Sequence, residues 1–392
     1  MKRPALFLAV LFYSCLALAQ PSEPDYSAAP SSPVQVVYSI DGSTLTTYNV
    51  DPQTFQATQV GSIALAQSIY PGLITSANGR FLYYTAYLDY SQTGHKLYVY
   101  DTNASGAPGS SPVQILDAHG LISMLADPKG TFFYAVRAGQ TGPQFTPYSV
   151  LRYTVNASTG KINQPVVEAN YQLDSGTGGS QLCTLGILGM NAAGTELYDE
   201  IFCSYHGGDS ATYNERTVNT QTGALGPDVQ VYSWNNSYGG YENVQFANNL
   251  MFDFVSPNNY QQNINLVNVY RIQPNVNTPL ISCGTSMLAA CGDFIWPLAH
   301  PSGKYVFLTD PSVVTDIGQL ESTTKSIVQT SSIPYEVQHF SPDGSVAYAA
   351  NDVNGALIIQ IYGFNISTGA VTAGDAINVP SDLDSWFTAI RY

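Results

Sequence analysis

The sequence predicts an all-β fold, a seven-bladed β-propeller built from four-stranded antiparallel blades. Composition is the first indication: the 392 residues include 28 Tyr and 33 Gly, 44% are hydrophobic and only 10% are charged. Such a chain is too apolar to be disordered and too poor in Glu, Lys and Arg to form a long helical bundle. The second indication is a repeat of about 50 residues that holds four short strands, the pattern of a propeller blade.

A tight turn with Gly at its end marks each clear repeat unit. These turns lie at 76–79, 127–130, 191–194, 300–303 and 341–344. Pro sets φ at the second position of several of them, and Gly accepts the positive φ at the end. An apolar and aromatic strand follows the turn.

A second signature, Tyr-x-x-Asn/Asp-x-x-Thr, occurs at 48–54, 153–159 and 362–368, with a variant lacking Tyr at 216–222. The Asn or Asp side-chain oxygen can open such a turn by accepting backbone N–H groups. After an N-terminal segment, we place units near 70–118, 119–170, 182–235, 241–283, 291–331 and 334–380. Six or eight blades are the alternatives, because the units near 241–283 and 291–331 are degenerate.

The two chain ends are predicted to share one blade. Residues 36–40 read as a second strand without a first, and residues 386–392 read as a first strand without a blade. Pairing the C-terminal strand with the N-terminal blade closes the ring, which leaves no open edge between the first and last blades.

These repeats resemble those of the seven-bladed lactonase-like propellers, the family of bacterial 6-phosphogluconolactonase and the YVTN-repeat surface proteins. The resemblance rests on Ser-Pro-Asp-Gly at 341–344, His-Pro-Ser-Gly at 300–303, Tyr-Ala-Ala-Asn at 348–351 and Asn-Ala-Ser-Thr-Gly at 156–160. It covers nearly all of the chain after the leader and implies the fold. One fold of this kind hosts many activities, so it implies the chemistry less strongly.

The polar segment of the lactonase relatives does not carry over to this chain. Their Pro-Arg-His segment precedes a Pro-Asp-Gly turn on an inner strand, and the equivalent here is 334–340. The Arg and His positions fall near Glu336 and Val337. Lactone hydrolysis or isomerisation, as in the 6-phosphogluconolactonase type, therefore stands as an alternative, and whether the protein is an enzyme at all is open.

The N-terminus has the pattern of a secretory signal peptide. A basic start, an apolar stretch from Pro4 to Leu18 and small residues at Ala17 and Ala19 predict residues 1–19 as a cleavable signal. Residues 20–33 read as a flexible Pro/Ser-rich leader, and residues 34–392 as a single propeller domain. We expect a secreted, periplasmic or cell-surface protein with no membrane span. A membrane anchor or lipidation at Cys15 are the alternatives.

Four further cysteines fit an exported protein with disulfides. Counting back from the 191–194 turn sets Cys183 almost opposite Cys203, and Cys283 and Cys291 would close a short loop. Four cysteines allow three sets of pairs, and we expect the local one, Cys183 with Cys203 and Cys283 with Cys291. A metal site is the alternative, but the ligand spacing is poor and we expect no metal and no cofactor.

Candidate catalytic residues are few. His206 and Asp209 combine a base and a carboxylate in a loop, whereas Glu336 and His339 lie on a predicted inner strand, where three residues apart they should face opposite sides. A solvated polar loop is the alternative for the first pair. His300 reads as a turn residue.

Aromatic residues are the candidates for ligand binding. They lie in or beside predicted loops on the channel face: Tyr87, Tyr90, Trp234, Tyr238, Tyr241 and Tyr260. Aromatic faces beside amides suit sugar rings or a protein partner, although ordinary β-surface or core roles are the alternative.

The sequence therefore favours a monomeric propeller that binds a carbohydrate or protein through loops at the channel mouth. A lactone hydrolase or isomerase and a structural cell-surface repeat protein are the alternatives. The net charge of −15 argues against nucleic acid and against phosphorylated substrates, which need clustered cations.

Overall fold

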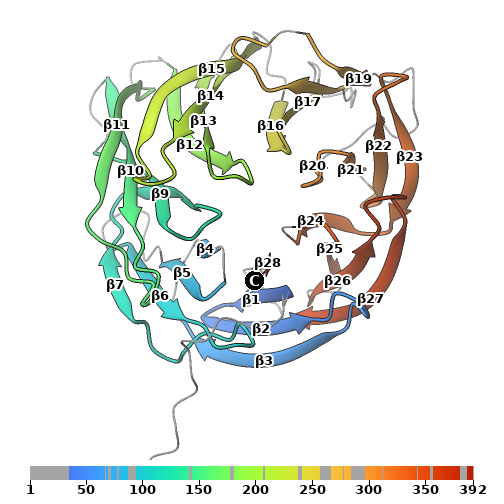
Figure 1. Ribbon diagram of the computed structural model, residues 1–392, viewed down its shortest axis with the longest axis horizontal. Coiled ribbons are helices and arrows are strands. Elements are labelled where there is room, and N and C mark those ends of the chain that lie inside the picture. Colours follow the sequence, from blue (N-terminus) through green and yellow to red (C-terminus); the bar gives the residue numbers. More distant parts are fainter. Residues whose placement is uncertain are drawn as a thin grey trace, which may run out of the picture.

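Figure 1 shows the computed structural model of the chain, in which seven sheets are arranged in a ring. It describes residues 35–391 except 67, 69–71, 77–78, 87–93, 141–143, 177–180, 206–207, 237–240, 257–265, 277, 284–295, 311, 342, 354–355 and 380–385. The predicted signal peptide and leader lie outside the described residues. No described helix is long and apolar enough to cross a membrane.

The strands of the first three blades follow one another along the chain. Blade 1 holds β4 (Gly72–Thr75), β5 (Phe81–Ala86), β6 (Lys96–Asp101) and β7 (Gln114–Asp117). Blade 2 holds β8 (Leu121–Ala126), β9 (Phe132–Ala138), β10 (Phe145–Thr154) and β11 (Val166–Asp174). Blade 3 holds β12 (Leu182–Met190), β13 (Glu196–Tyr205), β14 (Gly208–Val218) and β15 (Leu225–Asn236).

The remaining blades continue the ring. Blade 4 holds β16 (Tyr241–Ala247), β17 (Leu250–Ser256), β18 (Leu266–Arg271) and β19 (Ile281–Cys283). Blade 5 holds β20 (Trp296–Ala299), β21 (Tyr305–Thr309), β22 (Thr315–Glu321) and β23 (Ser326–Ile333). Blade 6 holds β24 (Glu336–Phe340), β25 (Val346–Val353), β26 (Ala356–Phe364) and β27 (Val371–Val379). Blade 7 holds β28 (Trp386–Arg391), β1 (Gln35–Asp41), β2 (Thr44–Val50) and β3 (Ala57–Ala64).

This arrangement confirms the predicted fold, the count of seven and the shared blade. Each sheet is antiparallel and four-stranded, and the first strand of each lies nearest the centre of the ring (Figure 1). In blade 7 the C-terminal β28 pairs with β1, from Trp386 opposite Ile40 to Arg391 opposite Gln35. The alternatives of six and eight blades are excluded, because the two degenerate units each form a complete sheet.

The first turn of the repeat works through the side chain at its opening position. Ser76 accepts the backbone N–H of Phe81 at 3.0 Å, and Asp127 accepts that of Phe132 at 2.7 Å. In blade 4, which lacks the turn Gly, Asn248 and Asn249 take the positive φ values of 48° and 61° themselves. Asn tolerates this region better than most residues, so the turn is kept without glycine.

The second signature confirms the predicted Asx turn. Asn156 Oδ1 accepts the backbone N–H groups of Ser158 and Thr159 at 3.0 and 3.1 Å. Asp51, Asn219 and Asn365 accept the equivalent pairs in their blades.

The glycine that ends the second signature packs on an aromatic side chain of the preceding blade. Gly160 of blade 2 lies against the Phe81 ring of blade 1, and Gly223 of blade 3 lies against the Phe132 ring of blade 2. A Cβ at either glycine would overlap the ring. At these two seams the glycine backbone of one blade therefore packs directly on an aromatic ring of the blade before it.

The seam between blades 6 and 7 reverses this arrangement. Phe55, with φ of 57°, stands where the other blades have glycine, and its ring and backbone press on Gly363 and Gly374 of blade 6. Val346 occupies the position at the start of β25 where blades 1 and 2 have Phe81 and Phe132. The large and small partners have changed sides, so the contact is preserved.

His300 belongs to the seam between blades 5 and 6. Its Nε2–H donates to the Gly344 carbonyl at 2.9 Å, and its Nδ1 accepts the Ser302 backbone N–H at 3.1 Å. The ring is fully buried among Phe307, Phe340 and other aromatics. Burial lowers the pKa of the His300 imidazole, which agrees with a neutral structural residue.

Replacing the glycine at an aromatic seam should destabilise the protein more than replacing one in open space. Gly160→Ala adds a methyl group that overlaps Phe81, whereas Gly42→Ala, at φ of 54°, meets no atom within 4 Å. Both variants bear the cost of a left-handed backbone, about 1–2 kcal/mol. Overpacking against the Phe81 ring should cost Gly160→Ala about 1–3 kcal/mol more. Urea unfolding of both variants measures the difference; equal losses would contradict the seam contact.

Candidate functional site

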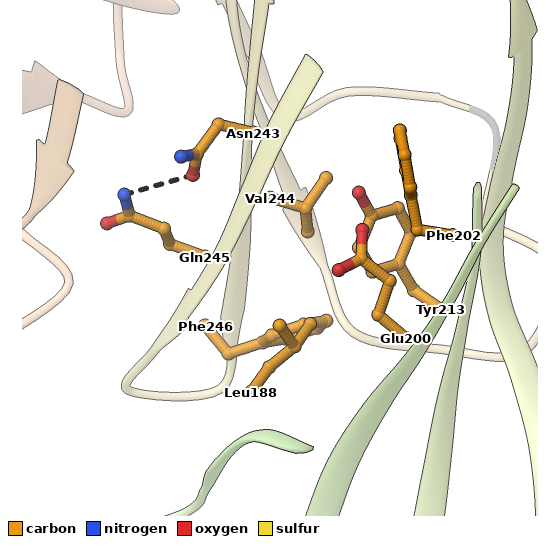
Figure 2. Close-up of a pocket in the computed structure, with 8 residues that line it drawn as sticks. All are labelled: Leu188, Glu200, Phe202, Tyr213, Asn243, Val244, Gln245 and Phe246. Carbon is orange, nitrogen blue, oxygen red and sulfur yellow. Dashed lines mark hydrogen bonds between the residues drawn. The ribbon is translucent and has the colours of Figure 1, made fainter. Parts of the chain in front are cut away.

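A cavity of about 570 Å³ lies between blades 3 and 4. Figure 2 shows its lining, which comes from β12 and the two strands that follow it, and from β16 of the next blade. The lining residues are Leu188, Glu200, Phe202, Tyr213, Asn243, Val244, Gln245 and Phe246. Its volume falls in the range of small-molecule sites, roughly 300–1,000 Å³.

The cavity reaches the inner edge of β16. Val244 and Phe246 pack toward blade 3, whereas Asn243 and Gln245 alternate to the opposite face of the strand, and all four line the same cavity. β16 is the first strand of its sheet, so its inner edge has no neighbouring strand. A cavity lined by residues of both faces reaches around that edge, which lies toward the centre of the ring (Figure 1).

Glu200 is the ionisable group of the lining. It lies on β13 opposite Tyr213 of β14, and the two side chains point into the same space in Figure 2. Burial raises the pKa of the Glu200 carboxyl, and a hydrogen bond with Tyr213 partly offsets that rise. The Tyr213 hydroxyl also accepts the Trp234 indole N–H at 3.4 Å. Trp234, Tyr213 and Glu200 thus form a chain that ends at the cavity.

The strand facing Glu200 has no side chain there. Gly186 of β12 pairs directly with Glu200, and a Cβ at Gly186 would meet no atom within 4 Å. Its φ is not positive, so neither backbone geometry nor crowding requires glycine. Glycine within a strand costs about 0.5–1 kcal/mol relative to Ala. Here it leaves open space beside a carboxyl group.

A β-bulge extends this bare surface along β12. The register shifts between Ile187 and Gly189, so Gly189 pairs with Tyr198, two residues from Glu200 on β13. Residues two apart on a strand share a face, and cross-strand partners do too. Gly186 and Gly189 therefore face the same seam although they are three residues apart, and bulged Leu188 is 39% exposed.

The amide of Gln245 has a structural role. Its Nε2 donates to the Pro297 carbonyl at 2.9 Å, and its Oε1 accepts the Ala299 backbone N–H at 2.7 Å. It also donates to Asn243 Oδ1 at 3.1 Å, the bond drawn in Figure 2. Gln245 ties blade 4 to the inner strand of blade 5 and fixes Asn243 at the mouth of the cavity.

The charge of the site is negative. Among the described residues that line the cavity, Glu200 is the one charged group, and there is no Arg, Lys or His. No cluster of three or more metal-ligating side chains occurs in the described part of the chain.

The described candidate Trp234 has a different position from the one expected. It packs in the core between blades 3 and 4 and supports Tyr213 rather than lying in a surface loop. Tyr241 begins β16, but its side chain lies outside the description. Tyr87, Tyr90, Tyr238, Tyr260 and His206 fall outside the described residues, so their roles stay predictions. Asp209 lies in β14, opposite Ser204 and Asn236.

The prediction that Glu336 and His339 face opposite sides of their strand was wrong. A bulge between Val337 and His339 sets Glu336 opposite Ala350 and His339 opposite Tyr348. Since Ala350 and Tyr348 share a face of β25, Glu336 and His339 share one as well. That face belongs to the seam with blade 7, far along the ring from Glu200.

The predicted pairing of Cys183 with Cys203 is confirmed. The two residues are direct cross-strand partners on β12 and β13, with Cα atoms 4.0 Å apart, and they form a disulfide. Cys283 is buried in β19, and Cys291 lies outside the described residues, so that pairing stays a prediction.

Sequence reasoning missed Glu200. The available signal was the segment Tyr198–Phe202, in which two adjacent acids, Asp199 and Glu200, interrupt an apolar second strand. Glycine at 186 and 189 of the facing strand was the other half of the signal. Combining the two requires the register of β12 on β13, and the bulge makes that register unpredictable from spacing.

Comparison with known proteins supports the fold. No family model matches the chain, and no curated sequence matches it. A candidate 6-phosphogluconolactonase from Bacteroides fragilis shares 13% identity over 92% of this chain and 99% of its own, with a TM-score of 0.55. A prolyl endopeptidase structure shares 10% identity over 88% of this chain and 50% of its own, with a TM-score of 0.51. The periplasmic gluconolactonase of Pseudomonas aeruginosa shares 11% identity over 91% and 99%, with a TM-score of 0.49.

Removing the charge of Glu200 should stabilise the protein near neutral pH. Because the pKa of this carboxyl is raised on folding, the native state binds its proton more tightly than the unfolded chain does. Its contribution to stability is then present below the ordinary pKa and lost as pH rises through the raised value. Glu200→Gln cannot ionise, so it should exceed wild type in free energy of unfolding at about pH 7.5 and match it at about pH 4. Urea unfolding at both values tests this; a variant less stable at neutral pH would show that the carboxylate is well solvated or paired.

Proposed function

We propose that this protein is an extracytoplasmic, lactonase-like propeller that binds a neutral carbohydrate in the cavity between blades 3 and 4. The observation that carries the proposal is the half-buried Glu200 carboxyl facing open space at Gly186, with aromatic rings on either side.

The lining suits the two surfaces of a sugar ring. Sugar C–H faces pack on aromatic side chains, and Phe202, Tyr213 and Phe246 provide such surfaces. Sugar hydroxyls are donors and acceptors, and Glu200 and Asn243 offer the matching groups. A carboxylate accepting hydroxyl hydrogen bonds in a partly dry site makes stronger bonds than a neutral acceptor.

The charge of the lining supports a neutral ligand. A phosphorylated or carboxylated sugar would meet Glu200 without a described cation to balance it. The net charge of −15 adds a long-range repulsion of anions. These facts weigh against a 6-phosphosugar lactone as the ligand.

Hydrolysis of a neutral lactone is the second candidate function. Its support is the raised pKa of the Glu200 carboxyl, since a carboxyl with a pKa shifted toward neutrality can act as a general acid or base. Turnover of glucono-1,5-lactone, followed by pH-stat, would favour this candidate over binding alone.

The proposed location outside the cytoplasm rests on two features. The signal-peptide pattern at residues 1–19 is one. The other is the Cys183–Cys203 disulfide, because disulfides persist mainly in oxidising compartments. Mass spectrometry of the exported protein would locate the new N-terminus, expected at Gln20.

A glycan array followed by isothermal titration tests the proposed binding. We expect wild type to bind at least one neutral glycan and Glu200→Gln to weaken that binding by about tenfold or more, since a hydrogen bond to a charged group contributes roughly 1.5–3 kcal/mol. Glu336→Gln is the matched control, because Glu336 is also a partly buried carboxyl with a raised pKa and lies on the inner strand of a distant blade. Loss of binding in the control alone, or no glycan bound by wild type, would contradict the proposal.

A further inference from the structure

A second cavity, of about 420 Å³, follows the first along the same strands. Its lining includes Tyr198 of β13, two residues before Glu200, and Met190 of β12, two residues after Leu188. Ile272, Pro128 and Pro301 add apolar surface from blades 4, 2 and 5. Polar groups at this cavity come from Asn side chains rather than from charged residues.

The two cavities meet at Phe246, which lines both. The Phe246 ring lies flat on the Tyr198 ring, with centroids 4.2 Å apart and an angle of 2° between the planes. The buried Tyr198 in turn donates its hydroxyl hydrogen to Glu196 at 3.0 Å. This stack fixes the ring that forms the boundary between the cavities.

The facing strand β12 offers no side chain directly opposite Glu200 or Tyr198. Gly189 pairs with Tyr198 as Gly186 pairs with Glu200, and a Cβ at either glycine would meet no atom within 4 Å. The seam between blades 5 and 6 is filled instead, because His300, Phe307 and Phe340 pack together there. The seam between blades 3 and 4 thus has open space at Gly186, opposite Glu200 of the first cavity, and at Gly189, opposite Tyr198 of the second.

We propose that the second cavity is an aglycone subsite, so that the ligand is a glycoside whose sugar contacts Glu200 and whose apolar aglycone packs beside Phe246 and Met190. This inference rests on the proposed carbohydrate site and extends it. A single sugar ring would leave the second cavity unused, whereas an apolar group joined to the sugar would bury surface there. Burial of apolar area contributes roughly 25 cal/mol per Å², so a phenyl group has ample surface for a measurable gain.

Matched pairs of methyl and phenyl glycosides of the same sugar test the inference by isothermal titration. Glucosides, galactosides, mannosides and N-acetylglucosaminides, in both anomers, form the panel. In wild type we expect the phenyl member of the bound pair to bind about tenfold or more tightly than the methyl member, which corresponds to about 1.4 kcal/mol.

Two glycine variants locate that gain. Gly189→Val places a side chain in the space opposite Tyr198, and the ratio of phenyl to methyl affinity should fall close to one. Gly186→Val fills the space opposite Glu200, so both members should bind more weakly. A Cβ at either position meets no atom within 4 Å, and Val favours strands, so thermal unfolding should show no loss of stability. Gly189→Ala repeats the test with a smaller group if the Val variant is destabilised.

The outcomes separate this inference from the proposed function. A wild type that binds methyl and phenyl glycosides equally, or a phenyl gain that survives both Gly189 variants, would overturn the aglycone subsite and leave the sugar site standing. Tighter binding of disaccharides than of phenyl glycosides would assign the second cavity to another sugar instead. Failure of wild type to bind any member of the panel and any neutral glycan of the array would overturn both proposals.

Discussion

The fold depends on the contact between neighbouring blades. A four-stranded sheet with two apolar faces cannot exist alone in water, and every blade here must be covered by the blade on either side. Buried side chains of successive blades therefore form shared clusters, such as Leu97 and Val99 of blade 1 with Phe133 and Leu151 of blade 2. The turn glycines and the aromatic rings that they touch set how closely the blades approach.

The candidate site is a departure from that packing. In the seam between blades 3 and 4, glycine replaces larger side chains on the inner strand, and a bulge turns two glycines to the same face. The resulting space is costly twice, because it forgoes apolar contacts and leaves a carboxyl partly dehydrated. Natural proteins tend to keep such local exceptions where they bind or transform something. The hydrogen-bonded chain from Trp234 through Tyr213 to Glu200 fixes the orientation of the Glu200 carboxyl in this space.

The repeat made the fold predictable, whereas the site was largely hidden. Turn chemistry such as Asn156 at the Asx turn and Gly344 at the tight turn is local, so the sequence predicts it directly. The Cys183–Cys203 pair also followed from counting, because the bulge between the turn and this pair shifts the register by only one residue. Glu200 could not be found this way, since its importance comes from residues absent on the facing strand and from side chains of the next blade. The bulge at Val337–His339 likewise reversed a facing argument that assumed a regular strand.

Closure of the ring depends on contacts between the most distant parts of the chain. Gln35 donates to Ser345 across 310 residues, and the Ala57 backbone N–H donates to Asp375 across 318, beside the reversed contact of Phe55 with Gly363 and Gly374. During synthesis the three strands β1 to β3 emerge first, and their partners in blade 6 and β28 emerge last. Blade 1 covers one face of the early strands soon after they emerge, but the other face lacks blade 6 and β1 lacks its edge partner for most of that time. Contacts of such separation form slowly, and the waiting strands are prone to aggregate. The Phe55 contact differs from the glycine–aromatic contacts of Gly160 and Gly223, because the aromatic side chain comes from the later blade of the ring and the glycines from the earlier one. Blade 7 therefore meets in blade 6 a surface of a different shape from the one that joins blades 1 to 3.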